Sequence, residues 1–227
     1  MLYVVDPSRV WLGPVVWIFL TIMCLVIPLA ALRQHHRMAR GTAALSRPSL
    51  YASALLTHAM FVALVWLATR HRLDLFPPYQ LRGWHVLVGL TALGIGLLPL
   101  IDRFQIDNPI GRAQLRLLTP RTGRDHLLFY AVCVSAGIAE ELTYRGLLFT
   151  LFSALIGGWW LPALLASSAF GVAHLFQGWK SAGFAGLMGL REHIVVGVTG
   201  TLFVAIVVHM LHDAIAGTAL AFKTRRD

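Results

Sequence analysis

The feature that most constrains this chain is a succession of long apolar segments containing few charged residues. Hydrophobic residues make up 57% of the 227 residues, charged residues only 13%, and the mean hydropathy is +0.70. A soluble domain carries about 25% charged residues. A membrane-spanning helix needs about 20 apolar residues, whereas a barrel strand needs only about 10, so these segments predict helices in a lipid bilayer. About seven segments can be drawn by that length: Trp11–Leu32, Leu50–Thr69, Trp84–Ile101, Leu127–Phe152, Leu161–Phe176, the weaker Ala182–Val198, and Thr201–Phe222.

We therefore predict an all-α fold, a polytopic membrane bundle of about seven transmembrane helices in which residues 1–227 form a single membrane-embedded domain. The first apolar segment is too long for the core of a signal peptide and lacks a small-residue cleavage site after it, so we expect it to be retained as a span. The expected location is the cell (inner) membrane, with the lipid bilayer itself as a partner.

The basic residues between the segments predict the orientation of the bundle. Loops that follow the odd-numbered segments hold thirteen lysines and arginines, and the other loops and the N-terminal stretch hold four. Because basic residues favour the cytoplasmic side, we expect the N-terminus outside and the C-terminus in the cytoplasm, which requires an odd number of spans. The net charge of +9 is explained by this topology and by anionic headgroups, so no nucleic-acid partner is expected. The basic stretch 102–125 fits either a surface amphipathic helix or a solvated loop.

Ionisable residues inside three of the apolar segments are the candidate functional residues, since such residues rarely lie in a bilayer without a role. The fourth segment holds Glu140, Glu141 and Arg145, the fifth holds His174, and the seventh holds His209, His212 and Asp213.

Helical spacing assigns these residues to faces. Glu141 and Arg145 are four residues apart and are predicted to pair, which neutralises two charges in an apolar environment. Glu140 lies about 100° around the helix from Glu141 and is left to face a cavity. His209 and Asp213 are also four residues apart and share a face.

A carboxylate and imidazoles in one cavity can perform hydrolysis. A glutamate with a histidine can take a proton from water and direct the water at a carbonyl, while a second histidine stabilises the oxyanion. The same set, Glu140, His174 and His209, could instead hold a divalent metal such as zinc. The sequence contains neither the HExxH pattern of zinc helices nor the GxSxG pattern of serine hydrolases. The cofactor, a metal or none, is left open.

Three short motifs resemble those of the CPBP family, which comprises CAAX prenyl proteases and bacteriocin-processing membrane proteases. They are "EELTYRG", of the form EExxxR; "FGVAH", from Phe170 to His174, of the form FxxxH; and "HMLHD", from His209 to Asp213, of the form HxxxD. The similarity extends over about Ala136 to Ala216, within a catalytic core expected at about 126–222. It implies an all-helical intramembrane endopeptidase, and the count of basic residues in the loops places the site near the cytoplasmic side, which suits a peptide or lipidated-protein substrate.

The resemblance also implies a role for each motif residue. Glu140 would be the base that activates water and His174 its partner. His209 and Asp213 would stabilise the oxyanion. Glu141, Arg145 and Phe170 would give structural support. The family is described both as metal-dependent and as a metal-free glutamate protease. Asp213 stands where the prenyl-protease branch often has Asn, and an aspartate suits a metal or an imidazolium better than a neutral oxyanion donor.

Two other functions are compatible with the sequence. A proton-coupled transporter could use Glu140 and the histidines as a relay, although neither an internal repeat nor paired proline-broken segments are visible. A non-catalytic relative could serve as a scaffold or immunity factor, but it would not need the glutamate and both histidines.

Several polar residues lie outside the three motifs. Arg191, Glu192 and His193 are charges unexpected in the sixth segment, which indicates either a helix that lines water or a wrong boundary. The single histidines of the second and third segments, His58 and His85, are predicted to make polar contacts between helices. His212 is predicted to lie at a helix interface.

Overall fold

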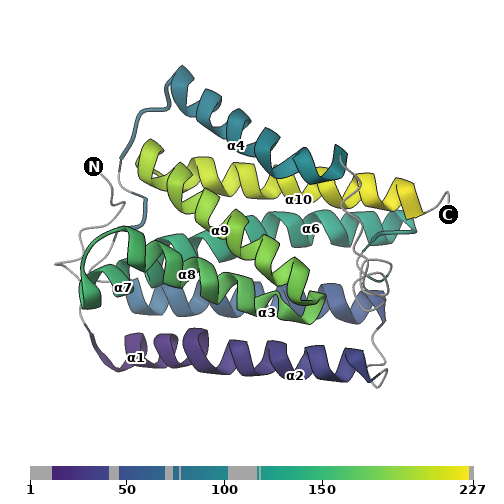
Figure 1. The fold of residues 1–227 in the computed structure, drawn as a ribbon, viewed down its shortest axis with the longest axis horizontal. Coiled ribbons are helices and arrows are strands. Elements are labelled where there is room, and N and C mark those ends of the chain that lie inside the picture. The colour runs from purple at the N-terminus through teal and green to yellow at the C-terminus, as the bar shows by residue number, and fades with distance from the viewer. Residues whose placement is uncertain are drawn as a thin grey trace.

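A computed structural model of the protein describes residues 12–40, 46–69, 74–76, 78–101, 117 and 119–224, with the side chains of 99–101, 223 and 224 excepted. All regular structure in these residues is helical, which confirms the predicted all-α class (Figure 1). The helical elements are α1 (Pro14–Thr21), η2 (Ile22–Val26), α2 (Ile27–Ala39), α3 (Arg47–Thr69), α4 (Gly83–Ile101), α6 (Gly123–Glu140), η3 (Glu141–Leu148), α7 (Phe149–Ile156), α8 (Trp160–Ala173), η4 (Leu175–Gln177), α9 (Trp179–Thr199) and α10 (Leu202–Thr224).

These elements correspond to the seven predicted segments, but they differ in their capacity to cross a bilayer. Four helices of the described chain are long and apolar enough to span a membrane: Pro14–Ala39, Arg47–Thr69, Gly123–Ile156 and Leu202–Phe222. Two further apolar helices, Gly83–Leu98 and Trp160–Ala173, are shorter than 18 residues. Helix α9 is in neither group, in keeping with the charged residues at its centre. The orientation of the termini stays a prediction, and most of the stretch 102–125 lies outside the described residues.

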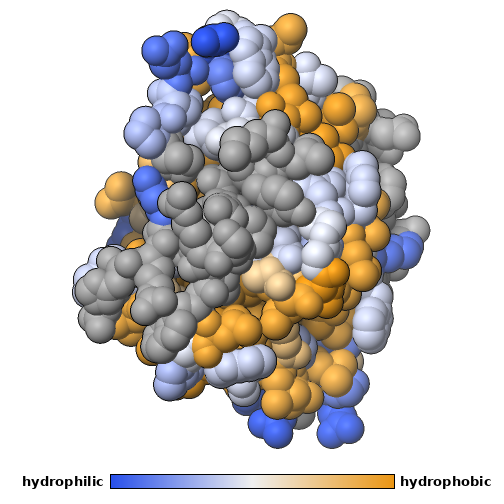
Figure 2. Space-filling model, turned by 90° about the vertical axis from the view of Figure 1, so that its left-hand side faces the viewer, coloured by the Kyte–Doolittle hydropathy of each residue, from blue (hydrophilic) through white to orange (hydrophobic). Residues whose placement is uncertain are grey.

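The long helices run side by side, and α9 crosses in front of them (Figure 1). Helix α6 packs against α3 and α10, α10 packs against α4, and α8 packs against α9. In the most apolar 18-residue stretch of α3, only 22% is buried within the protein. The corresponding share is 44% in the span that contains α6, η3 and α7. The exposed remainder is apolar, as at Leu56 and Trp66 of α3, and Figure 2 shows apolar side chains reaching the surface between hydrophilic ones. Such faces suit contact with lipid, so the chain is an integral membrane protein with the α6–α7 helix at its centre.

Helix α6 begins at a capping box. The Thr122 hydroxyl accepts a hydrogen bond from the Asp125 backbone N–H, and the Asp125 carboxylate accepts one from the Thr122 N–H, both at 3.1 Å. Arg47, at the start of α3, lies 3.5 Å from the same carboxylate. These contacts satisfy backbone donors at the helix start and fix the adjacent ends of α3 and α6.

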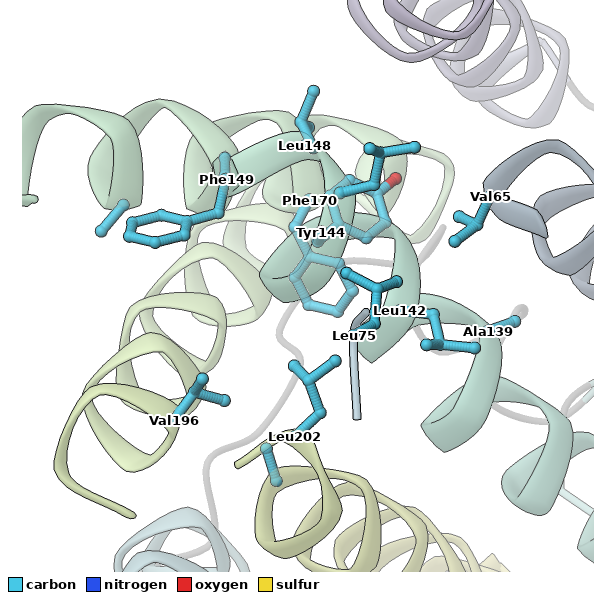
Figure 3. Close-up of a cluster of buried hydrophobic side chains, with 14 of the residues drawn as sticks. Val65, Leu75, Ala139, Leu142, Tyr144, Leu148, Phe149, Phe170, Val196 and Leu202 are labelled. Atoms are coloured by element: carbon cyan, nitrogen blue, oxygen red, sulfur yellow. The ribbon is translucent and has the colours of Figure 1, made fainter. Parts of the chain in front are cut away.

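The interior is a continuous apolar cluster contributed by most of the helices (Figure 3). Tyr144 of η3 lies at its centre, with its ring edge-on to Phe170 of α8 at 5.0 Å and to Phe61 of α3 at 6.4 Å between centroids. These aromatic contacts join η3 to two helices that are distant in sequence, so the segment carrying the two glutamates is held from both sides.

Helices α8 and α9 approach closely because small residues lie between them. A Cβ added to Gly171 would lie 2.7 Å from the carbonyl oxygen of Ala182 and 3.1 Å from the Cα of Gly186. Close approach of backbones through small residues is how membrane helices gain packing contacts when lipid offers no hydrophobic drive. The turn that leads into α8 is formed by Gly157 and Gly158, whose φ angles of 70° and 71° favour glycine.

Helix α9 runs unbroken through Arg191, Glu192 and His193, so the predicted boundary was not wrong at these charges. Glu192 and His193 are buried, and Arg191 forms an ion pair with Glu192 while donating to the Ala92 carbonyl of α4 at 3.0 Å. The three residues therefore lie at helix interfaces.

Candidate active site

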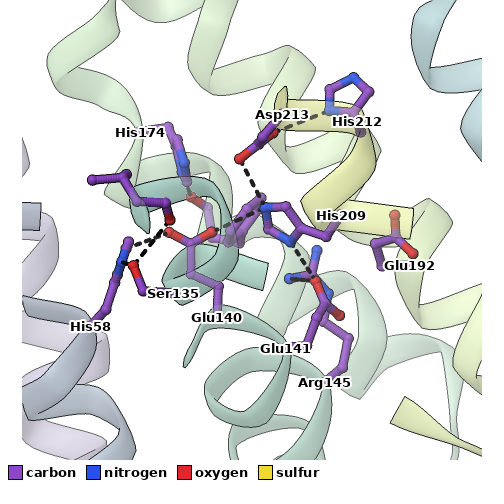
Figure 4. Close-up of polar contacts among 12 residues, drawn as sticks. His58, Ser135, Glu140, Glu141, Arg145, His174, Glu192, His209, His212 and Asp213 are labelled. Carbon is purple, nitrogen blue, oxygen red and sulfur yellow. Dashed lines mark hydrogen bonds and ion pairs between the residues drawn. The ribbon is translucent and has the colours of Figure 1, made fainter. Parts of the chain in front are cut away.

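The two glutamates of the first motif lie where the central helix changes its winding. Helix α6 ends at Glu140, η3 is wound as a π-helix from Glu141 to Leu148, and α7 continues without a break. Wider π turns inside α-helices occur frequently at functional sites. Both glutamates therefore lie deep in the bundle, on consecutive residues that project in different directions (Figure 4).

Glu141 and Arg145 form the predicted ion pair. Glu141 Oε1 lies 3.1 Å from Arg145 Nη1, and both side chains are buried, at 0% and 1% exposure. The Arg145 guanidinium also lies 4.4 Å from the centroid of the Phe170 ring, a cation–π contact. The pair thus links η3 to α8 through Phe170. Removing the charge of either partner would leave the charge of the other partner buried and uncompensated.

His209 of α10 lies among three carboxylates. Its Nδ1 lies 2.7 Å from Glu141 Oε1, and its Nε2 lies 3.5 Å from both Glu140 Oε2 and Asp213 Oδ2. Each ring nitrogen faces a carboxylate oxygen, so a hydrogen is needed between the two atoms of each contact. A neutral imidazole carries only one such hydrogen, so a second one lies on the ring or on a neighbouring carboxylate. The contact with Glu141 fixes the ring plane and directs Nε2 at Glu140.

Asp213 is the most exposed of the acidic groups at the site, with 37% of its side chain accessible. Its other oxygen lies 3.2 Å from Nδ1 of His212, and His212 Nε2 lies 3.2 Å from the carbonyl oxygen of Gly96 in α4. His212 is therefore at the predicted helix interface. Of the carboxylates at the site, that of Asp213 is therefore the one most accessible from outside the protein.

The predicted segment Leu161–Phe176 implied that His174 lies within a helix. In the structure, His174 instead lies just after the end of α8. Helix α8 ends at Ala173, because His174 takes φ −89° and ψ 4° and a short 3-10 turn, η4, follows. Its Nδ1 donates to the Phe170 carbonyl at 2.8 Å, and its ring lies 4.5 Å from the Phe170 ring. Glu140 interacts electrostatically with the imidazoles of both His174 and His209. Figure 4 shows His174 on the same side of Glu140 as Asp213.

Besides His209, a second imidazole contacts Glu140, and its place at the site was not predicted from the sequence. His58 of α3 lies with Nε2 3.4 Å from Glu140 Oε1 and with Nδ1 2.8 Å from the Ser135 hydroxyl of α6. The predicted interhelical contact of His58 is thus confirmed. His85 differs, because its Nδ1 accepts from the Arg82 backbone N–H at the start of its own helix. No pattern in the sequence indicated that α3 packs with this residue against Glu140.

A second buried charge cluster lies next to the Glu141–Arg145 pair. Glu192 of α9, paired with Arg191, interacts electrostatically with Glu141, Arg145 and His209. Figure 4 shows its side chain beside His209, on the opposite side from His174. The sequence indicates no role for Glu192, and the helix packing brings this residue to the border of the site.

The arrangement does not fit a metal centre. In the part of the chain that the structure describes, no three histidine, cysteine, aspartate or glutamate side chains are grouped so that they could hold a metal ion. The nitrogens of His209 face carboxylates that belong to the site, and His174 Nδ1 is used by a backbone carbonyl. Glu140, His174 and His209, the metal ligands that the sequence allowed, therefore do not fit a metal ion in this arrangement.

The structure is thus that of an all-helical membrane protein in which a buried glutamate lies among imidazoles from separate helices. Residues 123–215 match the family described as type II CAAX prenyl endopeptidase Rce1-like. The match confirms the resemblance to the CPBP family over these residues. The matched residues contain all three motifs and extend from the start of α6 into α10, while α1 to α4 lie outside the match. No curated protein and no solved structure matches the chain.

Proposed function

We propose that this protein is an intramembrane endopeptidase of the CAAX prenyl protease type, in which Glu140 activates the water that attacks the peptide bond. The observation that carries the proposal is the position of Glu140. Only 13% of its side chain is exposed, and one oxygen faces an imidazole of α3 while the other faces an imidazole of α10. The family match of the surrounding segment supports peptide hydrolysis as the reaction.

The reaction follows from the positions of the side chains. The Glu140 carboxylate takes a proton from water as the water oxygen bonds to the carbonyl carbon of the substrate. The Nε2–H of His209 lies within reach of the negative oxygen that forms, and Asp213 and Glu141 hold that ring in place. Glu140 then gives its proton to the leaving nitrogen as the C–N bond breaks, which releases one new carboxyl group and one new amino group.

His174 is proposed as the partner of Glu140 on the accessible side of the site. Its Nδ1–H is held by the Phe170 carbonyl, so the neutral ring presents Nε2 as an acceptor. An acceptor at this position can orient the attacking water. Asp213, as a carboxylate, cannot donate to an oxyanion, and we assign it to positioning His209 and His212.

The proposed substrate is a peptide or lipidated protein that reaches the bilayer at its cytoplasmic side. A CAAX substrate carries a prenyl group on a cysteine near its C-terminus. The apolar outer faces of the bundle suit the diffusion of such a group in lipid toward the site. The cell (inner) membrane is the proposed location.

The test uses purified protein in liposomes with a synthetic peptide that ends in a prenylated CAAX sequence, and mass spectrometry of the products. Wild type should cleave this peptide and leave the matched peptide without the prenyl group largely intact. Glu140→Gln preserves size but cannot accept the proton, and it should cleave at least about 100 times more slowly. Cleavage by the variant at the wild-type rate would overturn the proposal. A proton flux in peptide-free liposomes, together with no cleavage, would show a transporter instead.

A further inference from the structure

We propose that His58 and Ser135 form a hydrogen-bonded support that holds one oxygen of Glu140 and leaves the other oxygen to face His209 and take the proton from water. This inference rests on the proposed role of Glu140 and adds two positioning residues to it. His58 lies outside the segment that matches the family, so the support is contributed by a helix that the three motifs do not include.

The contacts divide the two oxygens of Glu140 between two helices. His58 Nε2 lies 3.4 Å from Oε1, and His209 Nε2 lies 3.5 Å from Oε2. His58 is 7% exposed and lies on the side of α3 that packs against α6. A carboxylate held by one oxygen cannot rotate about its last bond, so the second oxygen keeps one direction toward the reacting water.

The Ser135 hydroxyl can donate to Nδ1 of His58 or accept from it, and each arrangement requires a different protonation of the imidazole. The Ser135 hydroxyl has a single hydrogen and two partners within reach, the carbonyl oxygen of Val132 at 3.0 Å and Nδ1 of His58 at 2.8 Å. When the hydroxyl donates to Nδ1, the hydrogen of a neutral His58 lies on Nε2 and is directed at Glu140. When the hydroxyl turns to Val132, its oxygen accepts from Nδ1–H, and His58 then donates to Glu140 only as an imidazolium. In both arrangements, the Nε2–H of His58 donates to Glu140, as an ionised carboxylate requires.

The burial of this group of residues argues against an incidental contact. Side chains of His58 and Glu140 are 9% and 13% exposed, and a buried carboxylate without a donor is strongly unfavourable. The chain from Ser135 through His58 to Glu140 joins two helices, because α6 contributes Ser135 and Glu140 and α3 contributes His58. The chain is a positioning device for a base and contacts no substrate atom.

The test measures kcat and KM separately for prenylated-peptide cleavage in liposomes, together with thermal unfolding. His58→Leu removes the donor and should lower kcat about 10- to 100-fold with KM little changed. His58→Gln places an amide N–H near the position of Nε2 and should recover most of that loss. His85→Leu is the matched control, since this buried histidine accepts from the Arg82 N–H and lies against the rings of Tyr79 and Trp84. The kcat of this variant should stay at the wild-type value.

Ser135→Ala provides a second arm in case His58→Leu fails to fold. It removes the hydroxyl partner of Nδ1 and should lower kcat by about 3- to 10-fold without changing KM. The inference is overturned if His58→Leu or Ser135→Ala, shown to be folded, keeps the wild-type kcat, or if His58→Gln is as slow as His58→Leu. A failure of the proposed function would look different, because Glu140→Gln would then also cleave at the wild-type rate.

Discussion

Removing the buried carboxylate of Glu141 is expected to destabilise the fold strongly. The Arg145 side chain is only 1% exposed, and Glu141→Leu removes the carboxylate that lies 3.1 Å from its guanidinium. Leaving one charge of a buried pair without its partner destabilises by about 3–5 kcal/mol. The cation–π contact with Phe170 is present in the wild type and in the variant, so it does not change this difference. A loss of about 3 kcal/mol corresponds to an unfolding constant raised roughly 100-fold.

The pairwise part of this effect is isolated by a double-mutant cycle. Glu141→Leu/Arg145→Met removes both charges and should cost less than Glu141→Leu alone, about 1–3 kcal/mol, because His209 Nδ1 still loses its acceptor. The measurement is unfolding in mixed micelles with increasing dodecyl sulfate, followed by tryptophan fluorescence. Lys180→Gln, at an exposed position, is the control and should change stability by less than about 0.5 kcal/mol. If the two single losses simply add in the double variant, the ion pair does not hold η3 in place and our reasoning is refuted.

Two further predictions follow from packing and from the donor set. Gly171→Ala should destabilise the protein by about 1–3 kcal/mol in the same unfolding assay, because the added Cβ would meet the α9 backbone. The control Gly183→Ala adds a Cβ in open space and should be neutral or stabilising by up to about 1 kcal/mol. Equal effects of the two substitutions would contradict the close approach of α8 and α9. Exhaustive chelation followed by dialysis should leave the cleavage rate of the wild type unchanged, since the nitrogens of His209 are directed at protein carboxylates; loss of cleavage that zinc restores would contradict this.

The fold class and the pairs within one helix could be predicted because both depend on local spacing. Apolar segments of spanning length predicted the seven helical segments, and a four-residue interval predicted the contacts of Glu141 with Arg145 and of His209 with Asp213. Hydropathy located the helix ends less well. The central helix was expected over Leu127–Phe152 and extends over Gly123–Ile156, because its start is set by the Thr122 capping box, which is polar.

Contacts between helices could not be predicted in the same way. Nothing in the spacing of α3 indicated that His58 would face Glu140, since that contact depends on how α3 and α6 are rotated against each other. The π winding of η3 also changes which residues of the central helix share a face after Glu141. The end of α8 at Ala173 depends on the conformation of His174, which the apolar pattern around it does not reveal.

The most direct test of the central claim is the single-turnover rate of peptide-bond cleavage by Glu140→Gln, compared with wild type in the same liposomes and with enzyme in excess over prenylated peptide. If Glu140 takes the proton from water, the rate should fall by about 100- to 10,000-fold while the unfolding temperature stays within a few degrees of the wild-type value. A folded variant that cleaves within about threefold of the wild-type rate would show that another group activates the water.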